Sequence, residues 1–169
     1  MPPDDIMFSG SVRAEQARHG SRETYARRAA KGGFAADLSD DAVTFIRNRT
    51  SAYLATASAD GQPYVQHRGG PPGFIEVLDR RTLGFAEYPG NRQFITSGNL
   101  SENARAFMFL MDYANARRLK LWGVAKIVAE PELVARLIAP DGIAVERALV
   151  FTIDAMDWNC SKYIPRLVS

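Results

Sequence analysis

The sequence predicts a mainly β fold with peripheral helices, in which an antiparallel sheet closes into a barrel. From residue 51 onward the apolar residues follow the two-residue period of strands, and most of the expected strands are joined by short turns. Before residue 48 the apolar residues follow helical spacing instead. We therefore expect one domain over residues 1–169, with a helical region over residues 1–48 and the barrel over residues 49–169.

Three short helices are expected in the N-terminal region. Ser11 can cap the first, over about residues 12–19, and Ser21 can cap the second, which ends before Gly32. Ser39 precedes the third, and the two aspartates that follow suit the positive end of a helix dipole. Apolar residues at helical spacing give this third helix a face toward the core.

Six or so strands follow, and turn residues predict how some of them pair. The dipeptide Asp60-Gly61 is a strong hairpin signal, and residues 79–82 are expected to form a second hairpin. The expected strands cover residues 53–58, 64–68, 74–78, 83–86, 106–111, 118–128 and 144–153, with a helix over residues 132–139. We expect this helix and the N-terminal ones to cover the openings of the barrel.

Composition narrows the functional class. With 21 Lys+Arg against 19 Asp+Glu, the net charge of +2 gives no reason to expect a nucleic-acid partner. The single cysteine, Cys160, excludes an internal disulfide framework, and two isolated histidines do not suggest a metal site. No apolar run approaches the ~20 residues of a membrane span, and the acidic start shows no secretory signal. A cytoplasmic protein that binds neither nucleic acid nor membrane is expected.

A run rich in glycine and proline, residues 68–74, interrupts the strand-rich region. Glycine and proline are poor sheet formers and leave backbone N–H and C=O groups free. One interpretation is a surface loop or a wide bulge. The other is a backbone rim for a flat ligand, because glycine lets another group approach the main chain closely.

A second candidate site follows at residues 90–93. Asn91 can cap a helix that contains Arg92 and Gln93. The free N–H groups of a helix N-terminus and the guanidinium of Arg92 would together suit a phosphate. The alternative is a plain solvated arginine. The sequence contains neither a P-loop nor a Rossmann fingerprint, which argues against a nucleotide hydrolase or a Rossmann dehydrogenase.

These motifs, in their order along the chain, resemble the pyridoxamine 5′-phosphate oxidase-related flavin-binding proteins. The resemblance spans nearly the whole chain. It rests on residues 67–74, 83–85, 90–93 and 98–100, on the long strand 119–128 with its central glycine, and on the segments 8–10, 157–160 and 163–165.

The resemblance implies an antiparallel split β-barrel that forms a homodimer, with FMN bound at the subunit interface. His67, Arg68, Gly69 and Gly70 would lie against the ring, with Arg68 reaching toward the ribityl chain or the phosphate. Asn91, Arg92 and Gln93 would hold the phosphate, and the neighbouring subunit would contribute Arg118, Lys120 and Trp158.

By the same resemblance, the function would be an FMN-dependent oxidoreductase acting on a small molecule or a pyridine nucleotide, with no catalytic side chain assigned. The chain lacks the terminal Arg-x-His element of true pyridoxamine phosphate oxidases, so a different substrate is expected. Three alternatives remain open. They are a deazaflavin-dependent reductase on the same fold, a non-catalytic flavin or haem carrier or sensor, and an anion- or partner-binding module built on the basic N-terminal helices.

Overall fold

The computed structural model describes residues 1–88, 90–158 and 162–165, and within them the chain forms one antiparallel sheet of seven strands. The spatial order is β2-β1-β5-β6-β7-β4-β3. The strands are β1 (Ser51–Ala57), β2 (Pro63–Gly69), β3 (Glu76–Asp79), β4 (Thr82–Glu87), β5 (Arg105–Asp112), β6 (Arg117–Val128) and β7 (Arg147–Trp158). The mainly β fold with peripheral helices is confirmed. Cys160 lies outside the described residues.

Both predicted hairpins form. β1 and β2 pair with Ala57 opposite Pro63, and Gly61 in the turn adopts a φ of 91°, which glycine adopts without strain. β3 and β4 pair across the second turn, although β3 begins at Glu76 because Phe74 and Ile75 precede it as buried loop residues. The remaining order joins strands distant in sequence, with β7 between β6 and β4.

The two edges of the sheet come together through side chains. β6 and β7 have 12 residues each, and their pairing shifts register between Trp122 and Gly123. Such a bulge increases the local twist and bends the strand. On the edge strand β2, Arg68 forms an ion pair with Glu87 at the end of β4, at 3.2 Å, with both side chains about one-tenth exposed. This contact links two strands that are not neighbours in the sheet.

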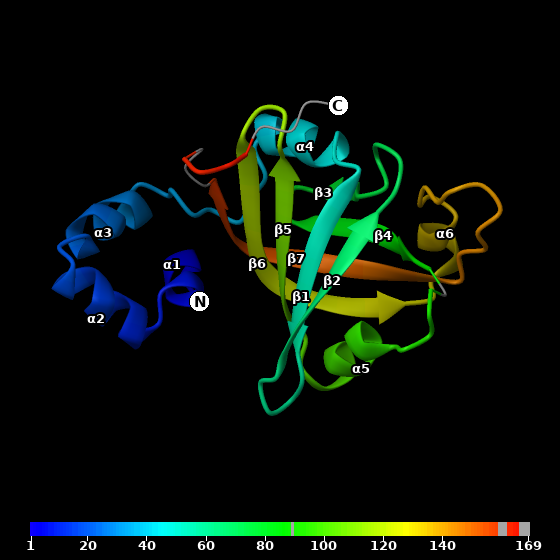
Figure 1. Ribbon diagram of the computed structural model, residues 1–169, viewed down its shortest axis with the longest axis horizontal. Coiled ribbons are helices and arrows are strands. Elements are labelled where there is room, and N and C mark those ends of the chain that lie inside the picture. Colours follow the sequence, from blue (N-terminus) through cyan, green and yellow to red (C-terminus); the bar gives the residue numbers. More distant parts are fainter. Residues whose placement is uncertain (89, 159–161, 166–169) are drawn as a thin grey trace.

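The helices are α1 (Pro3–Met7), α2 (Gly10–Arg18), α3 (Arg22–Ala30), α4 (Asp40–Arg47), α5 (Ile95–Glu102) and α6 (Pro131–Val134). α4 lies at one end of the barrel and α5 at the other (Figure 1). The amide of Ala42 donates to the Ser39 hydroxyl at 3.2 Å, so the predicted cap of α4 is confirmed, and Phe45 and Ile46 enter the core. Asn99 fixes α5 by donating to the Thr56 hydroxyl at 3.0 Å.

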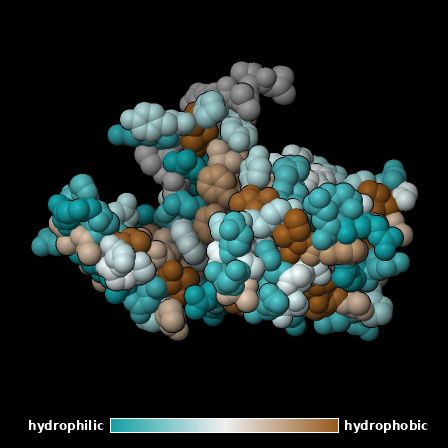
Figure 2. Space-filling view, turned by 60° about the horizontal axis from the view of Figure 1, so that its bottom comes forward, coloured by the Kyte–Doolittle hydropathy of each residue, from teal (hydrophilic) through white to brown (hydrophobic). Residues whose placement is uncertain are grey.

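Several predicted helix and strand limits are wrong. Ser9, not Ser11, accepts the bond from the Val12 amide that caps α2. α6 ends at Val134, well before residue 139, and β7 begins at Arg147 and runs on to Trp158. Helices α1–α3 do not cover an opening of the barrel. They project sideways as an arm, visible as a separate lobe with a largely hydrophilic visible surface (Figures 1 and 2). In the described part of the chain, no helix is long and apolar enough to cross a membrane.

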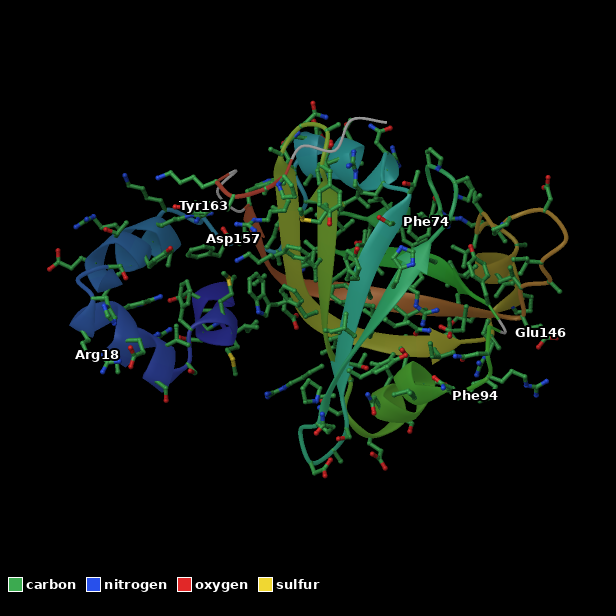
Figure 3. The ribbon with its side chains drawn as sticks, viewed as in Figure 1. Arg18, Phe74, Phe94, Glu146, Asp157 and Tyr163 are labelled. Carbon is green, nitrogen blue, oxygen red and sulfur yellow. The ribbon has the colours of Figure 1, made fainter. Side chains whose placement is uncertain are left out.

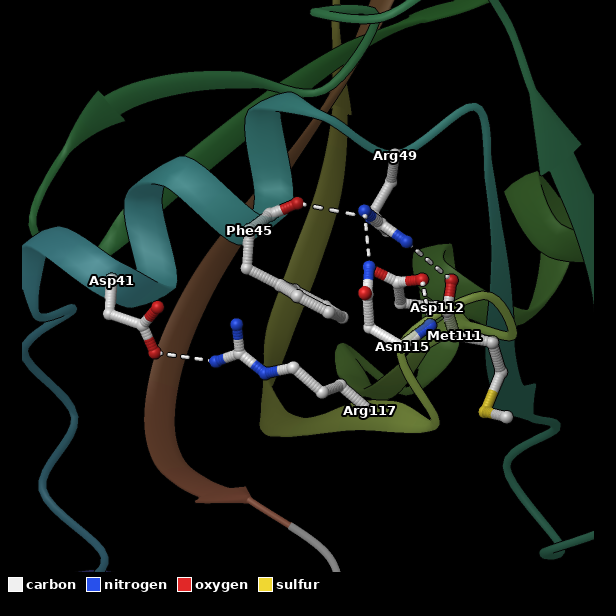
Figure 4. A network of polar contacts seen from close by, with 7 residues as sticks. All are labelled: Asp41, Phe45, Arg49, Met111, Asp112, Asn115 and Arg117. Carbon is white, nitrogen blue, oxygen red and sulfur yellow. Dashed lines mark hydrogen bonds and ion pairs between the residues drawn. The ribbon is translucent and has the colours of Figure 1, made fainter. Parts of the chain in front are cut away.

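A polar network ties α4 to the β5–β6 turn (Figure 4). Arg49 donates to the carbonyl of Phe45 at 3.1 Å and to that of Met111 at 3.0 Å, and it pairs with Asp112 at 3.0 Å. The backbone and side-chain amides of Asn115 both donate to Asp112. Burial alone would raise the pKa of Asp112, but these hydrogen bonds and Arg49 outweigh it, so the pKa lies below its ordinary value.

We expect Asp112→Asn to lower the free energy of unfolding by roughly 1.5–3 kcal/mol at pH 7, the range for hydrogen bonds to charged groups. The lowered pKa means that ionised Asp112 stabilises the fold above about pH 4, and that this contribution is lost as the pH falls through the folded-state pKa. Urea unfolding from pH 7 down to pH 2.5 should show the gap between wild type and variant closing. A gap that is constant with pH would contradict this, and Asp141→Asn, at an exposed position, serves as the control.

Candidate functional site

The loop between β4 and α5 has a strained backbone. Gly90, Arg92 and Phe94 all lie in the left-handed region, with φ values of 49°, 59° and 54°. Glycine accepts this conformation freely, whereas a residue with a side chain is uncommon there. Such strain concentrates at functional sites, where the surrounding structure maintains it. This loop is therefore the first place to look for a binding site.

The predicted helix that starts at Asn91 is wrong, because α5 begins at Ile95. The left-handed residues interrupt helical geometry, and the Asn91 side chain instead accepts a hydrogen bond from the Gln93 amide at 3.2 Å. Asparagine commonly stabilises a turn in this way. Arg92 thus stands on a turn, with its side chain exposed, and no helix N-terminus lies beneath it.

A groove runs between this loop and the edge strand β2. Tyr64 and Gln66 line it from β2, Glu87 and Tyr88 line it from the end of β4, and the loop contributes residues 90–97. The Thr96 hydroxyl donates to the Gln66 side-chain carbonyl at 2.7 Å, which fixes the start of α5 against β2. The groove therefore brings together three segments separated in sequence, with the predicted residues Asn91, Arg92 and Gln93 all on one wall.

A wider cleft of about 470 Å³ adjoins the groove and shares Arg92 with it. Its other lining residues are Glu87, Tyr88, Phe94, Ala144, Glu146 and Arg147. The Arg147 guanidinium lies over the Phe94 ring, 5.7 Å from its centroid. Figure 3 shows Phe94 and Glu146 at the end of the barrel opposite the N-terminal arm.

The electrostatics of this region favour an anion at Arg92. Glu87 is neutralised by Arg68, whose buried Nε atom has no hydrogen-bond partner. Burial raises the pKa of the Tyr88 hydroxyl, and the charge of Arg68 opposes that change in part, so Tyr88 is a neutral donor at pH 7. Arg92 and Arg147 remain as cations on the walls of the cleft.

The glycine-rich run contains both an inward and an outward-facing part. The Arg68 side chain is buried, whereas His67 is exposed and its ring lies 5.7 Å from that of Tyr53. A Cβ atom on Gly70 would lie 2.6 Å from the Phe74 Cβ, so this glycine lets Phe74 pack into the core. Gly69 faces His67 in the same way, at 3.0 Å. Both glycines thus have a packing role within the chain.

Arg118, Lys120 and Trp158 lie far from the groove in the same chain. Lys120 pairs across the sheet with Asp157 near the end of β7, whereas Arg147, which lines the cleft, begins that strand. An extended strand of this length spans roughly 35 Å. The Trp158 ring packs on Phe45 at 4.9 Å and under the Arg117 guanidinium at 4.4 Å. Within one protomer, these three residues do not join Arg92.

Sequence reasoning missed the wall of the groove formed by β2 and β4. Tyr64 and Gln66 share the inward face of β2 with Arg68, as their spacing of two residues could have indicated. Glu87 and Tyr88 carried no such signal, because their position depends on how β4 meets β2.

The donor set fits the phosphate end of a flavin mononucleotide. The amide of Asn91, the guanidinium of Arg92 and the amide of Gln93 surround a single groove, and all are groups that bind phosphate oxygens. Beside it, the edge strand β2 has backbone groups available for a planar ring. In the described part of the chain, no cluster of three His, Cys, Asp or Glu residues could hold a metal ion.

Comparison with known families gives the class. Residues 38–159 match the pyridoxamine 5′-phosphate oxidase family, and the chain belongs to it. This is a family of flavin-related oxidoreductases with a split-barrel fold. No protein of established function matches the chain in a search of curated proteins.

Solved structures share the fold. HupZ of Group A Streptococcus has a TM-score of 0.57 and 16% identity, over 72% of this chain and 99% of that one. A putative pyridoxamine 5′-phosphate oxidase from Lactobacillus delbrueckii has a TM-score of 0.56 and 20% identity, over 72% of this chain and 94% of its own. An F420 reductase has a TM-score of 0.50 and 21% identity, over 71% of this chain and 98% of that chain.

Proposed function

We propose that this protein is an FMN-dependent oxidoreductase that works as a homodimer, with the flavin at the subunit interface and a small molecule as substrate. The observation that carries the proposal is the groove in which Arg92 stands exposed on a strained turn, beside Asn91, Gln93 and the edge of β2. Membership of the pyridoxamine 5′-phosphate oxidase family supports a flavin as the group it holds.

In this proposal the chain binds and orients the cofactor. Arg92, Asn91 and Gln93 hold the phosphate, Gln66 and Tyr88 are polar partners in the same groove, and β2 meets the ring along its free edge. Bound FMN would supply hydride or electron-pair transfer with a small substrate or a pyridine nucleotide. Arg68 keeps Glu87 neutralised at 3.2 Å, so that its charge does not repel the phosphate.

The outward face of the sheet favours the homodimer. The aromatic side chains of Phe107 and Trp122, with rings 4.9 Å apart, lie on this face near Val65, which is 59% exposed. An apolar surface of this kind is characteristic of an interface between proteins. Arg118 and Lys120 lie on the same face of β6, so a second copy seated there would receive both at its own groove.

A purified sample tests the cofactor and the dimer together. We expect a yellow protein that releases FMN on heating and has the mass of a dimer by light scattering. Val65→Asp should shift the mass toward that of a monomer and weaken flavin binding at least tenfold, because a charge in a buried apolar interface is unfavourable. Val12→Asp, at another exposed valine located on the arm, should change neither.

The outcomes separate the alternatives. Protein that stays colourless with added FMN contradicts the proposal. Preferential binding of deazaflavin would assign the fold's other chemistry, suggested by the similarity to an F420 reductase. Flavin that binds tightly and is never reduced by a pyridine nucleotide would indicate a carrier or sensor. Haem binding in place of flavin would indicate the same.

A further inference from the structure

The N-terminal arm, residues 3–30 in helices α1–α3, lies outside the segment that matches the family, residues 38–159. It attaches to the barrel side through an aromatic contact, in which the Phe8 ring lies 5.4 Å from that of Phe34 and 5.5 Å from that of Tyr25. It attaches a second time through an ion pair, in which Arg28 Nη2 lies 2.5 Å from Asp157 Oδ1. Figure 3 shows Asp157 on the side of the barrel that faces the arm.

Arg28 differs in its partner from the other ion-paired arginines of the arm. Arg13 pairs with Asp4 and Asp5, Arg18 with Glu15, and Arg27 with Glu23, all within the arm itself. Arg28 reaches a residue 129 positions away, at the end of β7. It therefore links the arm to the sheet.

The chain around Arg28 is shaped to hold it. Its guanidinium lies 4.5 Å from the centroid of the buried Phe34 ring. The Gly33 amide donates to the Arg28 carbonyl at 3.0 Å. A Cβ atom on Gly33 would lie 2.5 Å from Arg28 Cγ and 2.8 Å from that carbonyl oxygen, so any side chain at Gly33 would displace Arg28.

Asp157 carries the link onward to Lys120. Its carboxylate is about one-tenth exposed, with Oδ1 facing Arg28 and Oδ2 lying 3.5 Å from the ammonium of Lys120. Because a buried carboxylate is stable only when it is paired, the two cations together fix its orientation. Lys120 in turn lies 5.5 Å from the Trp122 ring, on the outward face of the sheet.

We propose that Arg28 is a positioning residue for cofactor binding, which acts through Asp157 to hold Lys120 toward the flavin phosphate of the second copy. The inference rests on the proposed function, because only a second copy brings Lys120 to a groove. The arm thus adds to the family's barrel a support for the part of the site that is contributed across the interface. A substitution in the arm should then change the affinity for a ligand that the arm does not touch.

Flavin titration of the full chain tests this with a double-mutant cycle. Arg28→Ala should weaken FMN binding roughly 3- to 10-fold, a coupling typical of residues in one ion-pair network. Arg28→Lys should recover most of that loss, and Arg27→Ala should leave the affinity unchanged. In a Lys120→Ala background, Arg28→Ala should have no further effect. Unchanged affinity in Arg28→Ala, or losses that simply multiply in the double variant, would overturn the inference.

A measurement without flavin separates this inference from the proposed function. Acetylation of Lys120 by a water-soluble acetylating reagent, followed by mass spectrometry, should be faster in Arg28→Ala than in wild type or in Arg27→Ala, because the ammonium loses its fixed partner. An unchanged rate would refute the positioning role even if FMN binds. A faster rate in a protein that takes up no FMN would keep the positioning role and reject the proposed cofactor.

Discussion

Replacing Arg92 with alanine should weaken FMN binding by roughly 1.5–3 kcal/mol, or about 10- to 150-fold, the range for hydrogen bonds to a charged group. Arg92 is the cation common to the groove and the adjoining cleft, and its side chain is exposed and directed by a strained turn. Fluorescence titration of the apoprotein with FMN measures the change. Riboflavin, which lacks the phosphate, should bind wild type and variant equally well.

A second substitution at this position separates binding from folding. The backbone φ of 59° at Arg92 suits glycine better than alanine. We therefore expect Arg92→Gly to lose as much FMN affinity as Arg92→Ala while its unfolding temperature stays close to that of wild type. Arg136→Ala removes an exposed arginine outside the groove, paired only with Glu76, and should leave FMN affinity unchanged. A dissociation constant that does not change in either Arg92 variant would mean that the phosphate binds elsewhere.

Substituting Gly123 with alanine should destabilise the fold by roughly 3 kcal/mol or more, at the upper end of overpacking effects. A Cβ atom on Gly123 would lie 2.0 Å from the Thr152 carbonyl oxygen and 3.0 Å from the Phe151 ring. The nearest atom belongs to the backbone of β7, so the two central strands would have to separate at their bulge. Thermal unfolding should show a melting temperature lower by about 6–12 °C for a chain of this size.

Gly98 provides the matched control for that substitution. It lies within α5, and a Cβ atom there would meet no other atom within 4 Å. Gly98→Ala should leave the stability unchanged or raise it by up to about 1 kcal/mol, because alanine is the better helix former. Equal melting temperatures for Gly123→Ala and wild type would show that β6 and β7 can separate at the bulge without cost.

The local pairing of strands could be predicted from residues near one another in sequence. Asp60-Gly61 indicated the β1–β2 hairpin, and alternation from residue 118 onward indicated the strand that became β6. These predictions held because a turn type and a two-residue period depend on a few neighbouring side chains. The exposed arginine at position 92 was also identified as a candidate on its own chemistry.

The turn that carries Arg92 could not be predicted in the same way. Asn91 before a polar and then apolar stretch has the pattern of a helix cap, and the helix nevertheless begins only at Ile95. Packing decides this, because Thr96 at the start of α5 is bound to Gln66 of β2, and the preceding residues must adopt left-handed conformations to reach it. That constraint comes from a strand about 30 residues earlier.

By itself the sequence determined the helical and strand-rich regions, the hairpins and the residue types able to bind a phosphate, since each depends on local spacing and chemistry. Only the tertiary structure decided that Gln66 and Tyr88 face Arg92, that Asp157 joins Arg28 to Lys120, and that Trp158 lies at the far end of the barrel. The physical reason is the order of the sheet. With β7 between β6 and β4, the ends of the longest strands lie at opposite sides of the protomer, and nothing local in the sequence encodes that order.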